Sequence, residues 1–240
     1  MGIEYKLLDG GVAHVLLNRP EVMNALDTPG KEALGDCWAR AAADSAVRAV
    51  VVSGAGPRAF CAGSDVKEME RTGKMVSSEV LLKAIPNIGH ELDKPVIAAC
   101  HGYTIGMGLT VAMHADIRIA SRGGKFGFPE TPHGMISGFS AVTLPHIVGH
   151  GAAMEMMLSG RLFDAAEAMH LGLVHRLVDA HPDAALAEAL SVARKLAAQP
   201  PVAMAATKRL VMLELRAQIR TYFSEIDRAR VDVEKAKLGN

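Results

Sequence analysis

Short apolar runs alternate with turn residues and amphipathic stretches along the first part of the chain. Residues 3–8 and 12–17 are β-rich runs joined by Asp-Gly-Gly, which predicts an opening hairpin. Asp27 or Thr28, followed by Pro29, precedes an Ala-rich segment that ends near residue 43. A capping residue followed by proline is typical of a helix start, so we expect a helix here.

Two strand-loop-helix units follow, and the second resembles the first. In the first, residues 49–53 form a continuous apolar run, and after a glycine-containing loop a helical pattern begins at Asp65. In the second, the apolar run is 96–100, and the helical pattern begins at Gly108. Runs of this kind predict strands that are buried on both faces, and we expect them to be neighbours in one sheet.

The rest of the chain continues the alternation and then becomes helical. Residues 116–120 and 173–178 are further candidate strands, which together indicate an α/β fold. From Pro182 onward the pattern is helical, with a break at Pro200-Pro201. We therefore expect an α/β core over residues 1–190 and a helical oligomerisation region over 191–240, whose apolar positions serve the core or a subunit interface.

Composition narrows the class of protein. The chain has 240 residues, of which 50% are hydrophobic and 22% charged, which is typical of a globular protein and excludes disorder. Lys+Arg and Asp+Glu are 26 each, and this balance argues against nucleic-acid or anionic-membrane partners. Residues 95–115 lack charged side chains, but their glycines and histidines favour a strand, loop and buried helix over a membrane span. Three scattered cysteines and the absence of a signal-peptide pattern predict a cytoplasmic location.

Two of the loops could hold a carbonyl oxygen that gains negative charge. Such an oxygen needs two N–H donors that converge on it in a site without water. Gly63-Ser64 ends one loop at a helix start, and Gly106-Met107 repeats the arrangement in the second unit. Either loop alone is better explained as an ordinary turn. The repetition makes a backbone oxyanion hole from the Ser64 and Met107 N–H groups an equally good explanation.

Glu130 is the candidate acid/base. It stands between Pro129 and Pro132, behind an apolar approach of Phe and Gly. A carboxylate that is partly removed from water has a raised pKa, which suits proton transfer near neutral pH. The alternative is a solvated loop glutamate.

Other candidate chemistry is weaker. His146 and His150 have helical spacing but no acidic companion, so no metal site is expected. Ser140 lacks the second glycine of a nucleophile elbow, which argues against a triad hydrolase. His133, three residues after Glu130, is a candidate pocket residue. No dinucleotide or phosphate-loop fingerprint is present.

Several ordered motifs resemble the crotonase superfamily, that is, the enoyl-CoA hydratase/isomerase family. The resemblance covers nearly the whole chain. The motifs that carry it are Asn18-Arg19-Pro20, Asn24-Ala25-Leu26, Ala59-Phe60-Cys61-Ala62-Gly63-Ser64-Asp65, Lys94-Pro95-Val96-Ile97-Ala98, Gly106-x-Gly108, Ala115-Asp116-Ile117-Arg118, Pro129-Glu130 and Gly160-Arg161-x-Phe163-Asp164-Ala165.

The resemblance implies a crotonase-like spiral of ββα repeats with a C-terminal helical trimerisation region. It implies coenzyme A thioesters as substrates, with no separate cofactor, and a homotrimer or a dimer of trimers. Ser64 and Met107 match the oxyanion-hole positions, and Glu130 matches the second of the two glutamates that hydratases use. The positions that match the coenzyme A-binding stretch are Ala62, Asp65, Val66 and Lys67.

Three departures from the family pattern bear on the reaction. Thr110 stands where typical hydratases have their first glutamate, the glycine run is Gly-Met-Gly, and the loop over 134–140 looks one residue short. Because one carboxylate suffices to move a double bond, we expect an enoyl-CoA isomerase, with Thr110 and His133 in the substrate pocket. The alternatives are a single-glutamate hydratase or dehydratase, a thioester hydrolase or decarboxylase, and a non-catalytic acyl-CoA binder.

Overall fold

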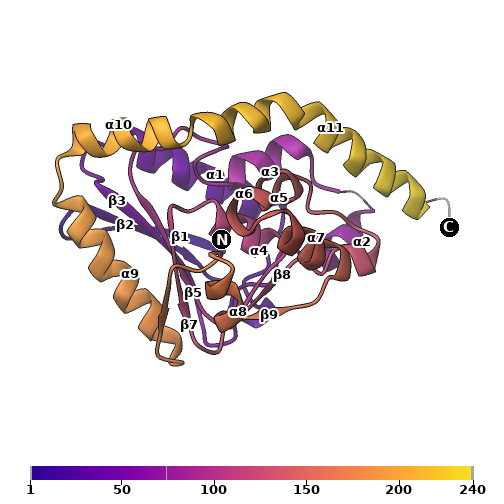
Figure 1. Ribbon diagram of the computed structural model, residues 1–240, viewed down its shortest axis with the longest axis horizontal. Helices are drawn as coiled ribbons and strands as arrows, with labels where there is room; N and C mark the ends of the chain where they lie inside the picture. Colours follow the sequence, from indigo (N-terminus) through magenta and orange to yellow (C-terminus); the bar gives the residue numbers. More distant parts are fainter. Residues whose placement is uncertain (1, 74, 239–240) are drawn as a thin grey trace.

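The predicted hairpin opens the larger of two sheets (Figure 1). The structure, a computed structural model, describes residues 2–73 and 75–238. The larger sheet has the order β1-β2-β3-β5-β7-β10, in which only the β1–β2 pair is antiparallel. Its strands are β1 (Ile3–Leu8), β2 (Val12–Leu17), β3 (Ala49–Gly54), β5 (Val96–Cys100), β7 (Ile117–Ser121) and β10 (Arg176–Val178). The two apolar runs are thus adjacent parallel strands, as predicted.

A smaller sheet carries the loops of interest. Its strands are β4 (Ala59–Cys61), β6 (Tyr103–Ile105), β8 (Lys125–Gly127) and β9 (Phe163–Asp164), in that order. The first three are parallel, so their carboxyl ends lie at one edge of the sheet. The β9 strand pairs antiparallel with β8.

The early helices confirm the sequence patterns. Helix α1 (Thr28–Ala43) has Asp27 as its N-cap, whose side chain accepts a hydrogen bond from the Gly30 amide. Helix α2 (Val66–Thr72) follows the first loop, and α4 (Met107–Met113) follows the second, one residue earlier than expected. The remaining elements before the C-terminal region are η1 (Pro20–Val22), α3 (Ser78–Ala84), η2 (Thr131–His133), α5 (Gly138–Thr143), α6 (Pro145–Val148), α7 (His150–Ser159) and α8 (Ala165–His170).

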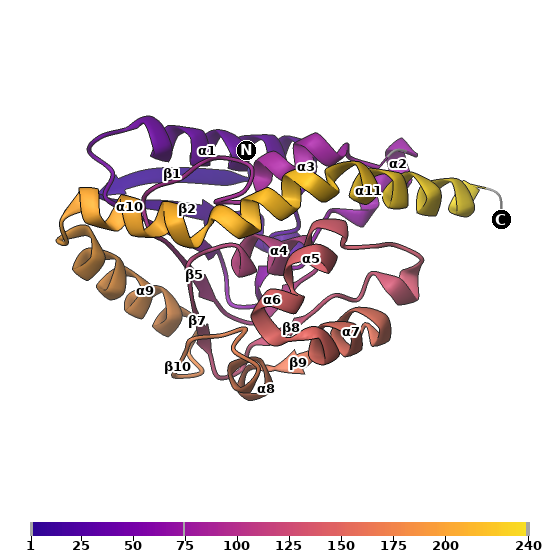
Figure 2. The same ribbon diagram turned by 45° about the horizontal axis from the view of Figure 1, so that its top comes forward.

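Three helices complete the chain, with the break at Pro200-Pro201 that the sequence predicts. Helix α9 (Pro182–Ala197) covers one face of the larger sheet, where Ala189 and Ala193 belong to the same buried cluster as Val51. The predicted division after residue 190 falls inside this helix, and an oligomerisation role for the region stays a prediction. Helices α10 (Pro201–Val211) and α11 (Leu213–Leu238) run along one side of the molecule, where α11 packs on α5 (Figures 1 and 2).

The main core lies on the other face of the larger sheet. It includes the fully buried Trp38 of α1, whose indole N–H donates to the Ala84 carbonyl. Ile219 on α11 is also buried in this core. Within the part of the chain that the structure describes, no helix combines the length and apolarity needed to cross a membrane.

Candidate active site

Three functional candidates follow the carboxyl ends of three adjacent strands. Ser64 lies three residues after β4 ends, Met107 two residues after β6, and Glu130 three residues after β8. Since these strands are parallel neighbours, their loops meet at one edge of the smaller sheet. The Gly106 amide also donates to the Gly127 carbonyl at 3.0 Å, which ties the Met107 loop to β8.

Two glycines allow these loops to approach one another closely. Gly63 and Gly106 both have positive φ, at 101° and 55°. A Cβ atom on Gly106 would lie 2.9 Å from Glu130 Oε1 and 3.6 Å from Gly63 Cα, and a Cβ atom on Gly63 would lie 3.5 Å from the Met107 nitrogen. A side chain at Gly106 would therefore displace the carboxylate.

Ser64 and Met107 present amides that the protein itself does not use. Among the described residues, neither N–H has a protein acceptor. Met107 is the first residue of α4, a fully buried helix, so its N–H points out of the helix N-terminus. Two unused amides in adjacent loops are what an oxyanion requires.

The Ser64 environment differs from the prediction in one respect. Ser64 was expected in the first turn of a helix, but Asp65 is the N-cap of α2 and accepts a hydrogen bond from the Glu68 amide, so the helix begins at Val66. Ser64 is held instead by an extended pairing with Leu26. The Leu26 N–H donates to Gly63 O at 2.8 Å, and Leu26 O accepts from the Asp65 N–H at 3.0 Å.

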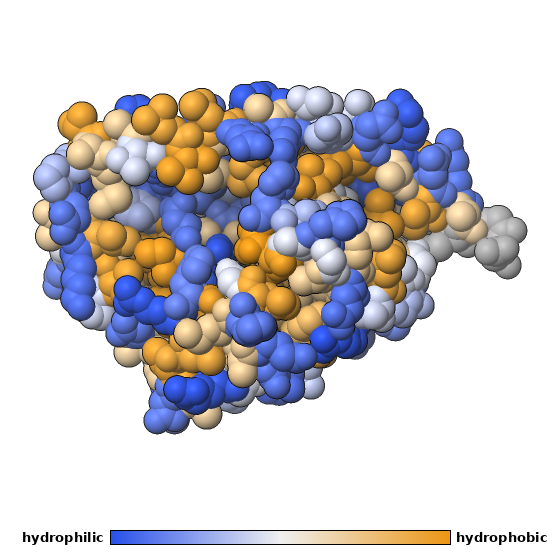
Figure 3. All heavy atoms as spheres, in the orientation of Figure 1, coloured by the Kyte–Doolittle hydropathy of each residue, from blue (hydrophilic) through white to orange (hydrophobic). Residues whose placement is uncertain are grey.

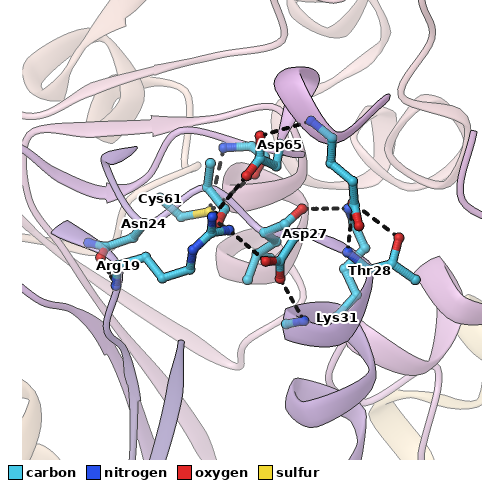
Figure 4. A network of polar contacts seen from close by, with 12 residues as sticks. Arg19, Asn24, Asp27, Thr28, Lys31, Cys61 and Asp65 are labelled. Carbon is cyan, nitrogen blue, oxygen red and sulfur yellow. Dashed lines mark hydrogen bonds and ion pairs between the residues drawn. The ribbon is translucent and has the colours of Figure 1, made fainter. Parts of the chain in front are cut away.

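A polar network supports this pairing from behind (Figure 4). Arg19 bridges Asp27 and Asp65, with 3.0 Å to each carboxylate. Lys31 is 1% exposed and donates from Nζ to Leu26 O at 2.6 Å. Burial lowers the pKa of Lys31 to about 8, although neighbouring carboxylates oppose the shift. The segment that pairs with Ser64 is thus fixed on both sides.

Glu130 has one oxygen held and one without a partner. Ser137 Oγ donates to Oε1 at 3.0 Å, whereas Oε2 is buried and accepts no hydrogen bond from the described residues. Burial raises the pKa of Glu130, and the Ser137 hydrogen bond partly opposes that rise. The raised pKa predicted from the two prolines is therefore confirmed in direction, and its main cause is desolvation.

A cavity of about 260 Å³ brings the three candidates together. A second cavity, of about 430 Å³, lies against Glu130 on the α7 side but contains neither Ser64 nor Met107. A carbonyl that reaches both amides must therefore enter the first cavity. The side chains and loops that line it are those of Ala62, Gly63, Ser64, Val66, Met69, Met75, Val76, Leu81, Gly106, Met107, Thr110, Pro129, Glu130, His133, Met135, Ile136, Ser137, Gly138, Phe139 and Arg230.

The other predicted substrate-binding residues divide into two groups. Ala62, Val66 and His133 line the cavity, and the last two are exposed at its rim. Asp65 and Lys67 do not line it. The Asp65 carboxylate faces Arg19 and the α2 N-terminus, and Lys67 is exposed on α2, where a contact with a coenzyme A phosphate stays a prediction.

Thr110 lines the cavity, but its hydroxyl is already committed. It lies 2.7 Å from Ser140 Oγ and donates to Gly106 O at 3.1 Å. Thr110 and Ser140 are both buried. The position at which the sequence departs from the family pattern is therefore occupied by two hydroxyl groups within hydrogen-bond distance of each other, and it provides no second base.

Two polar side chains of the cavity, those of Ser137 and Arg230, were not predicted, nor were several of its apolar side chains. Ser137 was seen only as part of a shortened loop, and its spacing of seven residues from Glu130 was the available signal. Arg230 comes from α11, about 100 residues further on, and sequence offered no signal for it. No group of three or more His, Cys, Asp or Glu side chains suited to a metal occurs among residues 2–73 and 75–238.

Comparison with known proteins agrees with these features. The profile of the enoyl-CoA hydratase/isomerase family matches residues 8–233. The (E)-benzylidenesuccinyl-CoA hydratase of Thauera aromatica is 38% identical over 204 residues, which are 84% of this chain and 79% of that protein. The short-chain-enoyl-CoA hydratase of Clostridium acetobutylicum is 33% identical over 216 residues, 89% of this chain and 82% of that protein.

Solved structures give the same result. The crystal structure of an enoyl-CoA hydratase/isomerase from Xanthobacter autotrophicus Py2 superposes with a TM-score of 0.86 at 32% identity, covering 98% of this chain and 87% of that one. The α/β architecture with a C-terminal helical part is thus the crotonase fold that the motifs predict. The chain belongs to the enoyl-CoA hydratase/isomerase family and is an acyl-CoA enzyme of that family.

Proposed function

We propose that this protein catalyses the reversible addition of water to the double bond of a 2-enoyl-CoA thioester. The single observation that carries the proposal is the buried Oε2 of Glu130, which has no partner among the described residues and shares a cavity with two amides that likewise have none there. Curated relatives are named as hydratases, which favours hydration over the double-bond isomerisation expected from the sequence.

In the proposed reaction the thioester oxygen accepts hydrogen bonds from the Ser64 and Met107 amides. Glu130 Oε2 takes a proton from a water molecule as the water oxygen bonds to C3, and the π electrons move onto the thioester oxygen as an enolate. The enolate then collapses, and C2 takes the same proton back from Glu130. One carboxylate serves as base and then as acid, and the two amides stabilise the intermediate charge.

Isomerisation of a 3-enoyl-CoA is the second candidate, and one observation favours it. Thr110 is bonded to Ser140 and Gly106, and among the described residues that line the cavity Glu130 has the single carboxylate. Glu130 would remove a proton from C2 and return it to C4, with the same enolate held between the two steps. This chemistry needs no bound water.

Turnover of crotonyl-CoA and of a 3-enoyl-CoA distinguishes the two candidates. Wild-type protein is expected to hydrate crotonyl-CoA, and Glu130→Gln to lose about 100-fold or more in kcat while still binding acyl-CoA. Preferred turnover of the 3-enoyl substrate would replace hydration by isomerisation. Near wild-type hydration by the Glu130→Gln variant would remove Glu130 from the mechanism.

The proposal includes a trimer-based assembly in the cytoplasm. Apolar side chains gather over α10 and the start of α11 (Figure 3), where Val202, Leu210, Val211 and Leu213 are 58–78% exposed. An exposed apolar patch of this kind is typical of a subunit interface. Light scattering at micromolar concentration is expected to give a trimer or hexamer, and a monomer would contradict the assembly.

A further inference from the structure

The wall of the cavity includes a buried cation. Arg230 lines the cavity together with the apolar side chains of Met75, Val76, Leu81 and Phe139. It is 6% exposed, and its aliphatic stem passes over Gly138. An arginine so far from water is normally paired with an anion, because an uncompensated buried charge is destabilising.

Within the described part of the chain, Arg230 has no such pair. Its two terminal nitrogens donate to neutral acceptors, Ser78 Oγ and the Val76 carbonyl. A guanidinium has five N–H groups, so these bonds leave three without an acceptor among the described residues. No carboxylate lies within 4.0 Å of the Arg230 nitrogens in the described residues.

The nearby acidic residues have other contacts. Asp227 accepts from Ser78 Oγ at 2.7 Å, and Glu234 accepts from the Met75 amide at 3.3 Å. With Glu79 they raise the pKa of Arg230, but burial is the larger effect and lowers it. They hold the 75–78 segment against α11 and leave part of the guanidinium uncommitted.

We propose that Arg230 is a specificity-determining residue that binds a carboxylate on the acyl group, so that preferred substrates are coenzyme A monothioesters of dicarboxylic acids. The thioester lies at Ser64 and Met107, and the acyl group extends from there between Met75, Val76 and Phe139 to Arg230. A carboxylate there accepts the free N–H groups and becomes the direct ionic partner that Arg230 lacks among the described residues. The inference rests on the acyl-CoA activity proposed above.

A binding comparison tests the subsite without depending on turnover. Isothermal titration calorimetry compares adipoyl-CoA with hexanoyl-CoA, and suberoyl-CoA with octanoyl-CoA, so that two chain lengths are covered. For at least one pair, wild-type protein is expected to bind the carboxylate-bearing member about tenfold or more tightly, the effect of a hydrogen bond to a charged group. Equal affinity in both pairs, or preference for the neutral members, overturns the proposal, and this needs no variant.

Variants separate recognition from a merely structural role. Arg230→Met is expected to abolish the preference, and Arg230→Lys to retain part of it. Arg228→Met, on the same helix but exposed and paired with Glu225, is the matched control and keeps it. A structural role for Arg230 would weaken both members of a pair equally, and a preference that survives in Arg230→Met also overturns the proposal.

The proposed reaction is assayed separately on crotonyl-CoA. A carboxylate preference without hydration refutes the proposed function and leaves the subsite standing. Hydration without a carboxylate preference refutes the subsite and leaves the proposed function standing.

Discussion

Substitution of Ser137 is expected to change the pKa of Glu130 without altering the carboxylate itself. The Ser137 hydroxyl donates to Glu130 Oε1 at 3.0 Å and makes no other hydrogen bond recorded in the structure. A donor to a carboxylate stabilises the charged form and lowers its pKa. Burial acts in the opposite direction and is the larger effect. Ser137→Ala therefore removes the larger of the two influences that oppose desolvation, and only a backbone hydrogen bond at Glu130 still opposes it.

The size of the change follows from the type of bond. A hydrogen bond to a charged group contributes about 1.5–3 kcal/mol, and water that enters the vacated space replaces part of it. About 1.4 kcal/mol corresponds to a tenfold change in an equilibrium constant. At pH values below the pKa of Glu130, we therefore expect about tenfold less of the ionised base in Ser137→Ala than in wild type.

The assay is the pH dependence of kcat/KM for hydration of crotonyl-CoA. Because the reaction begins with ionised Glu130, activity falls on the acid side, and the midpoint of that fall moves to higher pH in Ser137→Ala. Ser137→Thr keeps a hydroxyl at the same position and is expected to retain the wild-type midpoint. A uniform loss of rate with an unmoved midpoint, or a midpoint at lower pH, would refute the reasoning.

Three further perturbations test other parts of the site. Gly106→Ala is expected to reduce kcat/KM about tenfold or more, because its Cβ would lie 2.9 Å from Glu130 Oε1. The control Gly10→Ala, also at positive φ but with nothing within 4 Å, is expected to retain activity, and equal losses in the two variants would mean that backbone strain alone is responsible. Thr110→Ala should keep both hydration and isomerisation within about tenfold of wild type, because the hydroxyl that is removed bonds to Ser140 and Gly106. A loss of hydration beyond about 100-fold would show that Thr110 positions the water. Lys31 loses its proton near pH 8 in the folded state but only near pH 10.5 when unfolded. Chemical denaturation should therefore show the free energy of unfolding increasing between pH 8 and pH 10.5 by up to about 3 kcal/mol. Lys31→Met should lack this increase, and an equal increase in the variant would assign the effect to another group.

Local patterns predicted the strands of the larger sheet and several helices, whereas the short strands β4, β6, β8 and β9 of the smaller sheet were not predicted. Long-range contacts account for much of the difference. The run at 173–178 was expected to form a strand, but only Arg176–Val178 pair with β7. Upstream, the Leu173 carbonyl accepts a hydrogen bond from the buried Arg118 side chain at 2.6 Å. A buried arginine that takes a backbone acceptor 55 residues away cannot be foreseen from periodicity.

The same distinction holds for the site. Ser64 and Met107 were predictable as neighbours because the two loops repeat one local pattern, whereas Glu130 was grouped with them only through the family resemblance. The Thr110–Ser140 hydroxyl pair joins residues 30 apart, and Arg230 meets Ser78 across 152 residues. Such contacts depend on how α5 and α11 pack, which only the three-dimensional structure provides.

The short parallel strands β4, β6 and β8 position the groups of the proposed reaction, whereas the choice of substrate depends on other elements. Neighbouring strands are about 4.8 Å apart, so the spacing between the amides and the carboxylate is fixed by main-chain pairing and is indifferent to most side chains. The rest of the cavity wall instead includes side chains from α2, α3, α5 and α11, which the proposed acyl group would contact. Substitutions on those helices can accumulate without disturbing the pairing of the strands. The same reaction can therefore be adapted to different acyl groups as lineages diverge.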